Sequence, residues 1–325
     1  MKTNENRRAE RRHGPRVSAI ALLSLVWLSS SCASWAKSDA FLSGRPVGKV
    51  QNDSLRELSG IAASHRNPGV LYVHNDSGDA PQIYAINEKA QLLGACRIQG
   101  ATERDWEDIA VGPGPDPDRS YVFVGDIGDN GARYLEVVVY RVPEPKIDPV
   151  TPFNQMTIGP AEALRLVYPD KPRDAETLLV DPLSGDIYII SKRELAPRVF
   201  RAAYPQSTTQ QTKLEQVAVL PLGLFPTGGD VSPDGRRVIV RGMFNAAIWE
   251  RPVGEGAAHS KPRVGDRVPL WQAFSSQAKA IPVAAEPQGE AICFDYKGSG
   301  YFTISEGQYP TLYYFAPAEP NAPSQ

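Results

Sequence analysis

Residues 106–130 contain a pattern that returns four more times along the chain, and this repeat limits the possible folds more than any other feature. In this copy an acidic pair precedes a short apolar run at 109–111, and a turn rich in Gly, Pro and Asp follows it. A second apolar run at 121–124 then leads into the polar segment GDIGDN. Short apolar runs separated by turn residues predict two antiparallel strands with polar groups gathered at one end.

The five copies agree in register. Their first strands are expected at 59–63, 107–111, 176–180, 229–232 and 290–294, each followed by a turn that carries Gly, Pro, Asn or Asp. Second strands are expected at 71–76, 122–127, 188–193, 238–243 and 302–307, and third strands at 82–86, 136–142, 198–202, 246–251 and 311–316. Weaker fourth strands are expected at 92–98, 163–168, 215–221 and 268–273, and the last copy lacks one.

These repeats predict an all-β chain whose residues 45–318 form a single five-bladed β-propeller, because radial repetition of four-stranded sheets limits exposed strand edges. The N-terminal segment 46–51 is expected to supply the missing outer strand and to close the ring. Six blades are the second interpretation, although the 32 residues from 141 to 172 are too few for another blade. A sandwich or barrel is a third, and it would not require polar clusters to recur in register. Residues 319–325 are expected to form a flexible tail.

The first 36 residues have the pattern of an export signal. A basic segment precedes the apolar run 17–28, which is too short to span a bilayer, since a transmembrane helix needs about 20 apolar residues. Cleavage after Ala36 fits the small-x-small rule of signal peptidase, whereas the residues that end at Cys32 resemble a bacterial lipoprotein signal. We therefore expect an exported bacterial protein, which is either lipid-anchored to the cell envelope through Cys32, periplasmic or secreted.

Charge and cysteine content limit the partners. Six of the 35 basic and two of the 37 acidic residues lie in the leader, which leaves 29 and 35 and a net charge of −6. Such an acidic domain argues against nucleic acid, whose binding proteins carry basic patches. Cys96 is expected on an outer strand and Cys293 on an innermost strand, which favours two buried thiols over a disulfide. The expected partner is a small molecule or an envelope protein, membrane contact is limited to a lipid anchor, and the protein is expected to be a monomer.

The chain resembles a broad group of calcium-associated, TolB-like β-propellers: the SdiA-regulated and phytase-like proteins and, more distantly, the gluconolactonase and strictosidine-synthase relatives. The resemblance is carried by LSGIA, WEDIA, AETLLVD, TGGDVSPDG and GEAI at the inner strands, and by HNDSGD and GDIGDN at the ends of second strands. The resemblance extends over nearly the whole chain after the leader, and it consists of the shared repeat pattern. It implies a propeller of an exported bacterial branch, but the chain lacks the dense basic and acidic site that a phytase has for polyphosphate.

Register also predicts that polar side chains meet at one mouth of the central channel. The position before the first apolar run is Ser59, Glu107, Glu176, Gly229 and Glu290, with Asp108 and Asp230 one residue later. Near the end of the second strand lie Asn75, Asp126, Lys192, Gly242 and Glu306, flanked by residues that include His74 and Arg241. Carboxylates confined in one place repel each other, and a divalent cation relieves this repulsion.

Calcium is the expected cation, because it takes about 6 to 8 oxygen ligands in flexible geometry. The predicted ligands are Glu107, Glu176, Glu290, Asn75 and Asp126. Zinc is not expected, because the three histidines after the leader have no ligand spacing. The alternative is that these residues are solvated channel residues that hydrogen-bond to the backbone and to Lys192 or Arg241.

The Asp-rich loops have a simpler interpretation than a calcium loop. Counted from Asp126, GDIGDN places Gly128 and Val137 where an EF-hand requires ligands. Residues 129–131 are therefore expected to form a turn whose side chains hydrogen-bond to their own backbone, and the same interpretation is favoured for 75–79.

The chain has no Gly-x-Ser-x-Gly elbow, Walker loop or HExxH motif, which removes the usual support for serine hydrolases, nucleotide triphosphatases and zinc peptidases. If the protein is an enzyme, we expect a metal-assisted hydrolase of esters, lactones or phosphoesters. Glu176 or Asp126 would act as the base, and Lys192 or Arg241 would stabilise the developing anion. The alternative is a non-catalytic envelope propeller that binds or scaffolds a partner through a structural ring of carboxylates.

Overall fold

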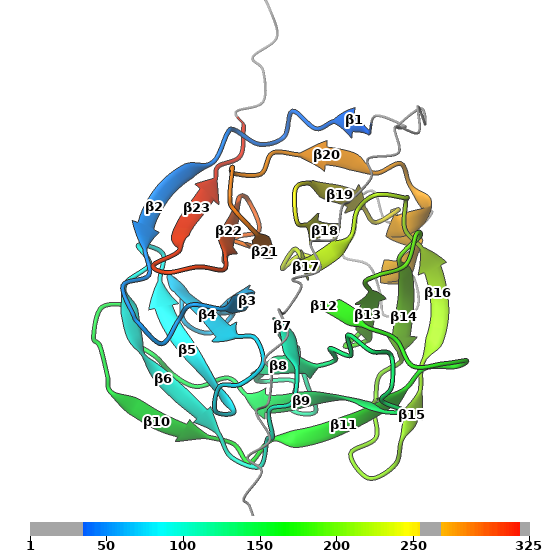
Figure 1. The fold of residues 1–325 in the computed structure, drawn as a ribbon, viewed down its shortest axis with the longest axis horizontal. Coiled ribbons are helices and arrows are strands. Elements are labelled where there is room, and N and C mark those ends of the chain that lie inside the picture. The colour runs from blue at the N-terminus through cyan, green and yellow to red at the C-terminus, as the bar shows by residue number, and fades with distance from the viewer. Residues whose placement is uncertain (1–34, 254–267, 319–325) are drawn as a thin grey trace, which may run out of the picture. The chain divides into compact units, whose positions relative to one another are not determined.

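The structure is a computed structural model that describes residues 35–253 and 268–318. Residues 1–34 of the expected export signal 1–36, which include Cys32, and the expected tail at 319–325 therefore lie outside the described residues. Five sheets surround a central axis (Figure 1), which confirms the predicted all-β, five-bladed β-propeller. One short 3-10 helix, η1 (Leu270–Ser275), is the only helix in the described part of the chain.

The blades follow the order of the chain. Blade I contains β3 (Leu58–Ala63), β4 (Val70–Asn75), β5 (Gln82–Asn87), β6 (Leu92–Ile98) and β10 (Gln155–Ile158). Blade II contains β7 (Trp106–Pro113), β8 (Ser120–Asp126), β9 (Val137–Pro143), β11 (Glu162–Val167) and β15 (Thr212–Lys213). Blade III contains β12 (Ala175–Val180), β13 (Ile187–Ser191), β14 (Arg198–Ala202) and β16 (Glu215–Val219).

The last two blades include strands from the N-terminal part of the chain. Blade IV contains β17 (Pro226–Val231), β18 (Arg237–Gly242), β19 (Ala246–Glu250), β20 (Lys279–Ile281) and β1 (Ala36–Lys37). Blade V contains β21 (Gly289–Phe294), β22 (Tyr301–Ser305), β23 (Thr311–Phe315) and β2 (Arg45–Lys49). In blade V, β2 pairs antiparallel with β23, so residues far apart in sequence share one sheet.

Apolar side chains between neighbouring blades hold the ring together. The innermost strands β3, β7, β12, β17 and β21 pack against each other in chain order, and β21 packs against β3. Five buried apolar clusters lie between successive blades, and each combines residues of two neighbouring sheets. Trp106, for example, belongs to blade II and is buried in the cluster that it shares with Tyr72 of blade I. Because the strands alternate their side chains, each sheet contributes one face to the blade before it and one to the blade after it.

Short outer strands account for the long interval between the second and third copies. After β9 the chain runs to blade I, where β10 pairs parallel with β6, and then returns to blade II as β11. In the same way β15 pairs parallel with β11 before the chain enters β16. Strands of two to four residues carry too little alternation to be recognised in a sequence, so the repeat pattern does not reveal them.

The predicted fourth strand at 268–273 is wrong. This segment leads into η1, and the antiparallel strand next to β19 is β20. Three residues of η1, Leu270, Ala273 and Phe274, are buried at helical spacing, and the ring of Phe274 contacts Trp249 edge-on at 5.4 Å. Packing of one helical face onto blade IV is thus favoured over a further strand.

Both cysteines in the described residues are buried free thiols, as predicted. Cys96 lies on β6 near the outside of blade I, and Cys293 lies on the innermost strand of blade V. None of the described residues belongs to a helix with the length and apolar character needed to cross a membrane.

Candidate functional site

Each innermost strand has an irregular pairing at the same position. The register of β7 with β8 skips Glu107, and that of β12 with β13 skips Glu176. Blades I, IV and V skip Ser59, Thr227 and Glu290 in the same way. A bulged residue lacks a direct partner and re-aims its side chain. The three glutamates therefore occupy equivalent positions of three blades, as the repeat indicated.

The bulged position expected in blade IV is wrong by two residues. Thr227, rather than Gly229, is the bulged residue, and its hydroxyl donates to the carbonyl oxygen of Glu290 at 2.9 Å. Gly229 lies where a Cβ would approach Thr177 to 2.8 Å, so a close contact between blades III and IV requires glycine there. The apolar pattern of this copy is short and Gly-rich, and such a pattern sets register weakly.

Five carboxylates from three blades lie close together. They form two groups, Asp76 with Asp105 and Glu107, and Glu107 with Asp174 and Glu176. In each group one oxygen of every residue lies within 4.8 Å of the others. We call these five residues the carboxylate cluster. Asp76 directly follows β4, Asp105 and Glu107 lie at the start of β7, and Asp174 and Glu176 lie at the start of β12.

Glu107 is shared by both groups and is 4% exposed. Its backbone carbonyl accepts from the Ser59 hydroxyl at 2.6 Å, but no donor among the described residues hydrogen-bonds to its carboxylate. Burial, followed by the charges of Glu176, Asp76 and Asp105, raises the pKa of Glu107 well above its usual value. A buried carboxyl group in this environment is stable only with a proton or with a nearby cation.

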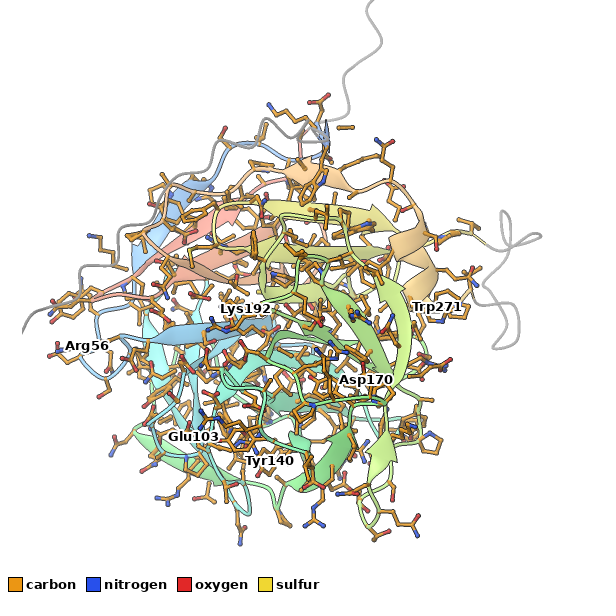
Figure 2. The ribbon with its side chains drawn as sticks, turned by 45° about the vertical axis from the view of Figure 1, so that its right-hand side comes forward. Arg56, Glu103, Tyr140, Asp170, Lys192 and Trp271 are labelled. Carbon is orange, nitrogen blue, oxygen red and sulfur yellow. The ribbon has the colours of Figure 1, made fainter. Side chains whose placement is uncertain are left out.

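Two neighbouring basic residues contact the cluster from the loop after β13. Lys192 Nζ donates to Glu176 Oε2, and Arg193 Nε donates to Asp174 Oδ2 at 2.5 Å. Burial raises the pKa of Glu176 to about 8, although Lys192 opposes that shift. Figure 2 shows Lys192 close to the centre of the ring, with Arg56 and Trp271 toward its edges. Two cations face five carboxyl groups, so the cluster retains an excess of acidic groups.

Blade V contributes a second acidic pair. Gln288 Nε2 donates to Glu306 Oε2 at 2.8 Å, and burial followed by the charge of Glu290 raises the pKa of Glu306 to about 7. Burial also raises the pKa of Glu290, while Gln288 and Lys192 lower it. Glu290 and Glu306 are not members of the two cluster groups, but both interact electrostatically with Lys192.

Two predicted ligands have other contacts. Asn75 Nδ2 donates to Ser54 O at 2.6 Å and to Asp79 Oδ2 at 2.9 Å. Asp126 accepts from the Asp105 backbone at 3.1 Å, and its carboxylate lies 3.4 Å from Arg104 Nε. Asp126 is not a member of the two groups of the carboxylate cluster, and the Asn75 side chain is held by its bonds to Ser54 and Asp79.

Two predicted mouth residues, Asp108 and Asp230, connect innermost strands. Asp108 Oδ2 accepts from the backbone N–H groups of Leu178 at 2.9 Å and Gly229 at 3.3 Å. Asp230 Oδ2 accepts from Phe294 N at 2.8 Å. Each carboxylate therefore satisfies backbone donors on the next blades, which is a structural use of a buried charge.

Arg241 and His74 are buried beneath the mouth. Arg241 is 1% exposed, and its Nη2 donates to Glu286 Oε2 at 2.5 Å while Nη1 donates to the Ala291 carbonyl at 3.3 Å. It thus connects blades IV and V. The His74 ring is fully buried, its Nδ1 lies 2.7 Å from Asn75 O, and burial lowers its pKa to about 4.

Sequence reasoning did not identify Asp76, Asp105 and Asp174 as site residues. A signal was present, because RDWE at 104–107 and RDAE at 173–176 place an aspartate two residues before each bulged glutamate. Asp76 was assigned to turn chemistry, and its Oδ1 does accept from Ser77 N at 2.6 Å. The turn interpretation is confirmed for Asp129, whose Oδ2 accepts from Arg133 N at 2.5 Å and Tyr134 N at 2.6 Å.

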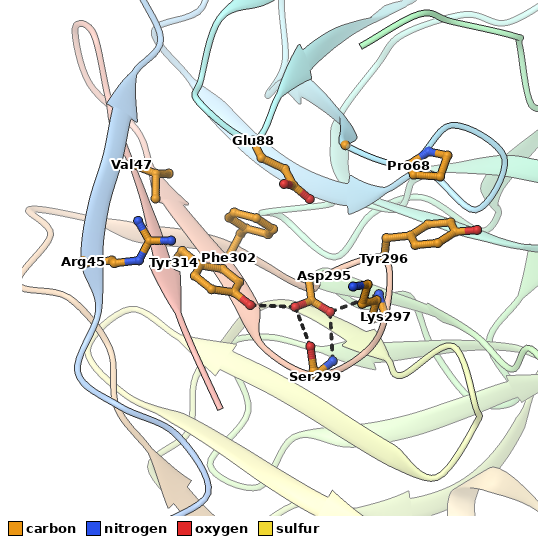
Figure 3. Close-up of a pocket in the computed structure, with 11 residues that line it drawn as sticks. Arg45, Val47, Pro68, Glu88, Asp295, Tyr296, Lys297, Ser299, Phe302 and Tyr314 are labelled. Carbon is orange, nitrogen blue, oxygen red and sulfur yellow. Dashed lines mark hydrogen bonds between the residues drawn. The ribbon is translucent and has the colours of Figure 1, made fainter. Parts of the chain in front are cut away.

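A separate pocket of about 440 Å³ lies between blades I and V (Figure 3). It is lined by the β3–β4 and β21–β22 turns, which are at the other ends of these strands from the carboxylate cluster. Its buried acid, Asp295, accepts from Ser299 N, Gly300 N and Tyr314 OH at 2.7 to 2.9 Å. Because these donors satisfy Asp295 and stabilise the turn, we place the candidate functional site at the carboxylate cluster.

Comparison with known proteins gives no family. No family model matches the sequence, and no curated protein matches it. Among solved structures, a hydrazine synthase from Kuenenia stuttgartiensis is similar with a TM-score of 0.41 and 10% identity, over 81% of this chain and 96% of that chain. A gluconolactonase from Xanthomonas campestris is similar with a TM-score of 0.48 and 11% identity, over 86% of this chain and 91% of that chain. Similarity at this level carries no functional argument, so the function has to be inferred from the site itself.

Proposed function

We propose that this protein binds calcium at the carboxylate cluster and uses it to hold a small, oxygen-rich ligand at the mouth of the channel. The observation that carries the proposal is the position of Glu107, which is buried, accepts no hydrogen bond on its carboxylate from the described residues and is shared by two groups of carboxylates. A divalent cation supplies the positive charge that this arrangement lacks. Oxygen ligands from several loops in irregular geometry suit calcium better than magnesium, which demands a near-ideal octahedron.

The residues divide into two sides around Glu107. Asp76 and Asp105 would complete a site on one side, and Asp174 and Glu176 would complete a site on the other. Lys192 and Arg193 form ion pairs with Glu176 and Asp174, whereas no basic side chain among the described residues forms an ion pair with the first group. We therefore infer that Asp76, Asp105 and Glu107 form the primary site.

Hydrolysis of an ester or lactone is the reaction that this site could perform. A bound calcium ion supplies a Lewis acid for a carbonyl oxygen. Glu306 has a pKa of about 7 and accepts a hydrogen bond from Gln288, so it can take a proton from water near neutral pH. Lys192 can donate to an oxyanion, provided that its contact with Glu176 opens.

Titration calorimetry with calcium chloride tests the binding proposal. Wild type should bind calcium, Glu107→Gln should weaken binding at least about tenfold, and Glu250→Gln on the exposed face of β19 should leave it unchanged. A wild-type protein that takes up no calcium would overturn the proposal. Initial rates on δ-valerolactone and p-nitrophenyl acetate, with calcium or EDTA, then separate enzyme from binding protein. Calcium binding without turnover would favour the non-catalytic envelope propeller.

We also propose that the protein is exported to the bacterial envelope and anchored through Cys32. Trp35 packs against the apolar cluster between blades III and IV, and Ala36 and Lys37 form β1, which pairs with β20. Processing before Cys32 keeps these contacts, whereas cleavage after Ala36 removes Trp35 and divides β1. The intact mass of the mature protein distinguishes the two products, and an unmodified N-terminus at Lys37 would exclude the anchor.

A further inference from the structure

A pocket of about 310 Å³ lies directly beside the carboxylate cluster. It is formed where the loop after β13, the segment before β17 and the loop after β18 meet. Most of its lining is apolar, and the residues that define it are Leu224, Phe225, Met243, Phe244, Lys192 and Arg193. Its volume is close to the lower end of the range for small-molecule pockets, roughly 300 Å³, so it fits a group of several carbon atoms rather than a large ligand.

The two aromatic side chains of the lining are exposed, and hydrogen bonds fix the loops that carry them. Phe225 is 53% and Phe244 is 76% exposed, which is unusual for two large apolar side chains in one place. Phe225 has φ +48°, in the left-handed region that bulky residues rarely adopt, and such backbone strain gathers at binding sites. The two loops are connected, because Asn245 Nδ2 donates to Gly223 O at 3.1 Å. Gly242 N donates to Asn245 O at 2.8 Å and closes the loop after β18.

The pocket and the carboxylate cluster share a boundary. Lys192 and Arg193 line the pocket, and their polar ends contact Glu176 and Asp174 of the cluster. A ligand whose oxygen atoms reach the cluster therefore has room for its next atoms along these two side chains and between the phenylalanines.

Charge selects the type of ligand. With calcium bound, the two charges of the ion together with Lys192 and Arg193 face at most five carboxylates, so little net charge is left to attract an ionic group of either sign. An uncharged polar group with an apolar substituent suits both the cluster and the pocket. We propose that the ligand of the mouth is an uncharged ester or lactone with an alkyl or aryl group of several carbons, which binds against Phe225 and Phe244. This inference depends on the proposed function, since the cluster must hold the ester oxygens.

Two lactones that differ only in a tail test this inference. δ-Decanolactone carries a pentyl chain that δ-valerolactone lacks, and each buried methylene is worth up to about fourfold in affinity. In the presence of calcium, calorimetry with wild type should show binding of δ-decanolactone that is at least about tenfold tighter. Where the lactones are turned over, the ratio of KM values replaces the ratio of affinities.

Serine substitutions locate the preference. Phe225→Ser/Phe244→Ser should reduce the preference for the tailed lactone to about twofold or less, with calcium affinity unchanged. Val150→Ser is the matched control, because Val150 is 79% exposed and does not line this pocket. The single change Phe244→Ser, at the more exposed ring, is the second variant if the double variant does not fold.

Several outcomes would overturn the inference. Wild type that binds calcium but shows no preference for the tail excludes the subsite and leaves the calcium site standing. A double variant that keeps the preference places the tail elsewhere. Wild type that self-associates in sedimentation, and becomes monomeric in Phe244→Ser, shows that the pocket is an interface between copies. Absence of calcium binding instead overturns the proposed function, and it is seen before any lactone is added.

Discussion

Replacing Glu107 with Gln should make the calcium-free protein more stable, although it removes a side chain from the candidate site. Glu107 is 4% exposed, no donor in the described residues contacts its carboxylate, and burial and neighbouring acids raise its pKa well above the usual 4.5. The folded protein therefore keeps the proton of this group at pH values where the unfolded chain releases it. Glutamine has a similar shape and needs no proton.

The size of the effect follows from proton linkage. Well below pH 4.5 both the folded and the unfolded state hold the proton, so the pKa shift of Glu107 does not change the free energy of unfolding. Above pH 4.5 this group ionises in the unfolded chain, so the contribution of Glu107 to the wild-type free energy of unfolding falls by up to about 1.4 kcal/mol per pH unit until the folded pKa is reached. This decrease in the free energy of unfolding is absent in Glu107→Gln, because glutamine does not ionise. The variant and wild type should have similar free energies of unfolding near pH 4.5, and the variant should be more stable by up to about 2 kcal/mol at pH 6.

Urea denaturation in EDTA between pH 4.5 and pH 6 measures this difference. Glu250→Gln is the control for loss of one negative charge, because Glu250 is an exposed residue of β19 that contacts Lys279. Calcium should reduce the advantage of the variant by at least about 1.3 kcal/mol, because calcium at about 100 times the wild-type Kd stabilises wild type by about 2.7 kcal/mol and a variant that binds tenfold more weakly by about 1.4 kcal/mol. The reasoning is refuted if the wild-type and Glu107→Gln curves run parallel over this pH range, or if the variant is less stable without calcium.

Three further substitutions test other contacts, two of them between blades and one within blade IV. Asp108→Asn should lower the free energy of unfolding, measured by urea denaturation, by about 2 to 4 kcal/mol. Asparagine loses one of the three backbone N–H bonds that Asp108 accepts and weakens the other two. A decrease below about 1 kcal/mol would contradict this. Arg241→Met should cost about 3 to 5 kcal/mol by leaving Glu286 buried without its partner, and Arg241→Met/Glu286→Leu should recover most of that loss. Gly242→Ala should lower the unfolding free energy by about 1 to 3 kcal/mol, since its Cβ would meet the Leu224 carbonyl, and equal stability to wild type would show that the loop can shift.

Local sequence pattern determined the propeller and the order of its strands. Alternating apolar residues and Gly, Pro or Asp turns act over a few neighbouring residues, so each of β3, β7 and β12 can be recognised without its partners. The same local pattern placed Glu107, Glu176 and Glu290 at equivalent positions of three blades.

Only the tertiary structure decided which of these side chains meet. Asp76 and Asp174 join Glu107 because blades I and III lie on either side of blade II. Asn75 instead donates to Ser54 O and Asp79, and Asp126 accepts from the Asp105 backbone. The outer strands β10 and β15 and the helix η1 likewise depend on contacts with other parts of the chain. The physical reason is that the alternating pattern of the inner strands is set by neighbours in sequence, whereas the short outer strands and the partners of a buried charge are decided by which groups the ring brings within a few ångströms.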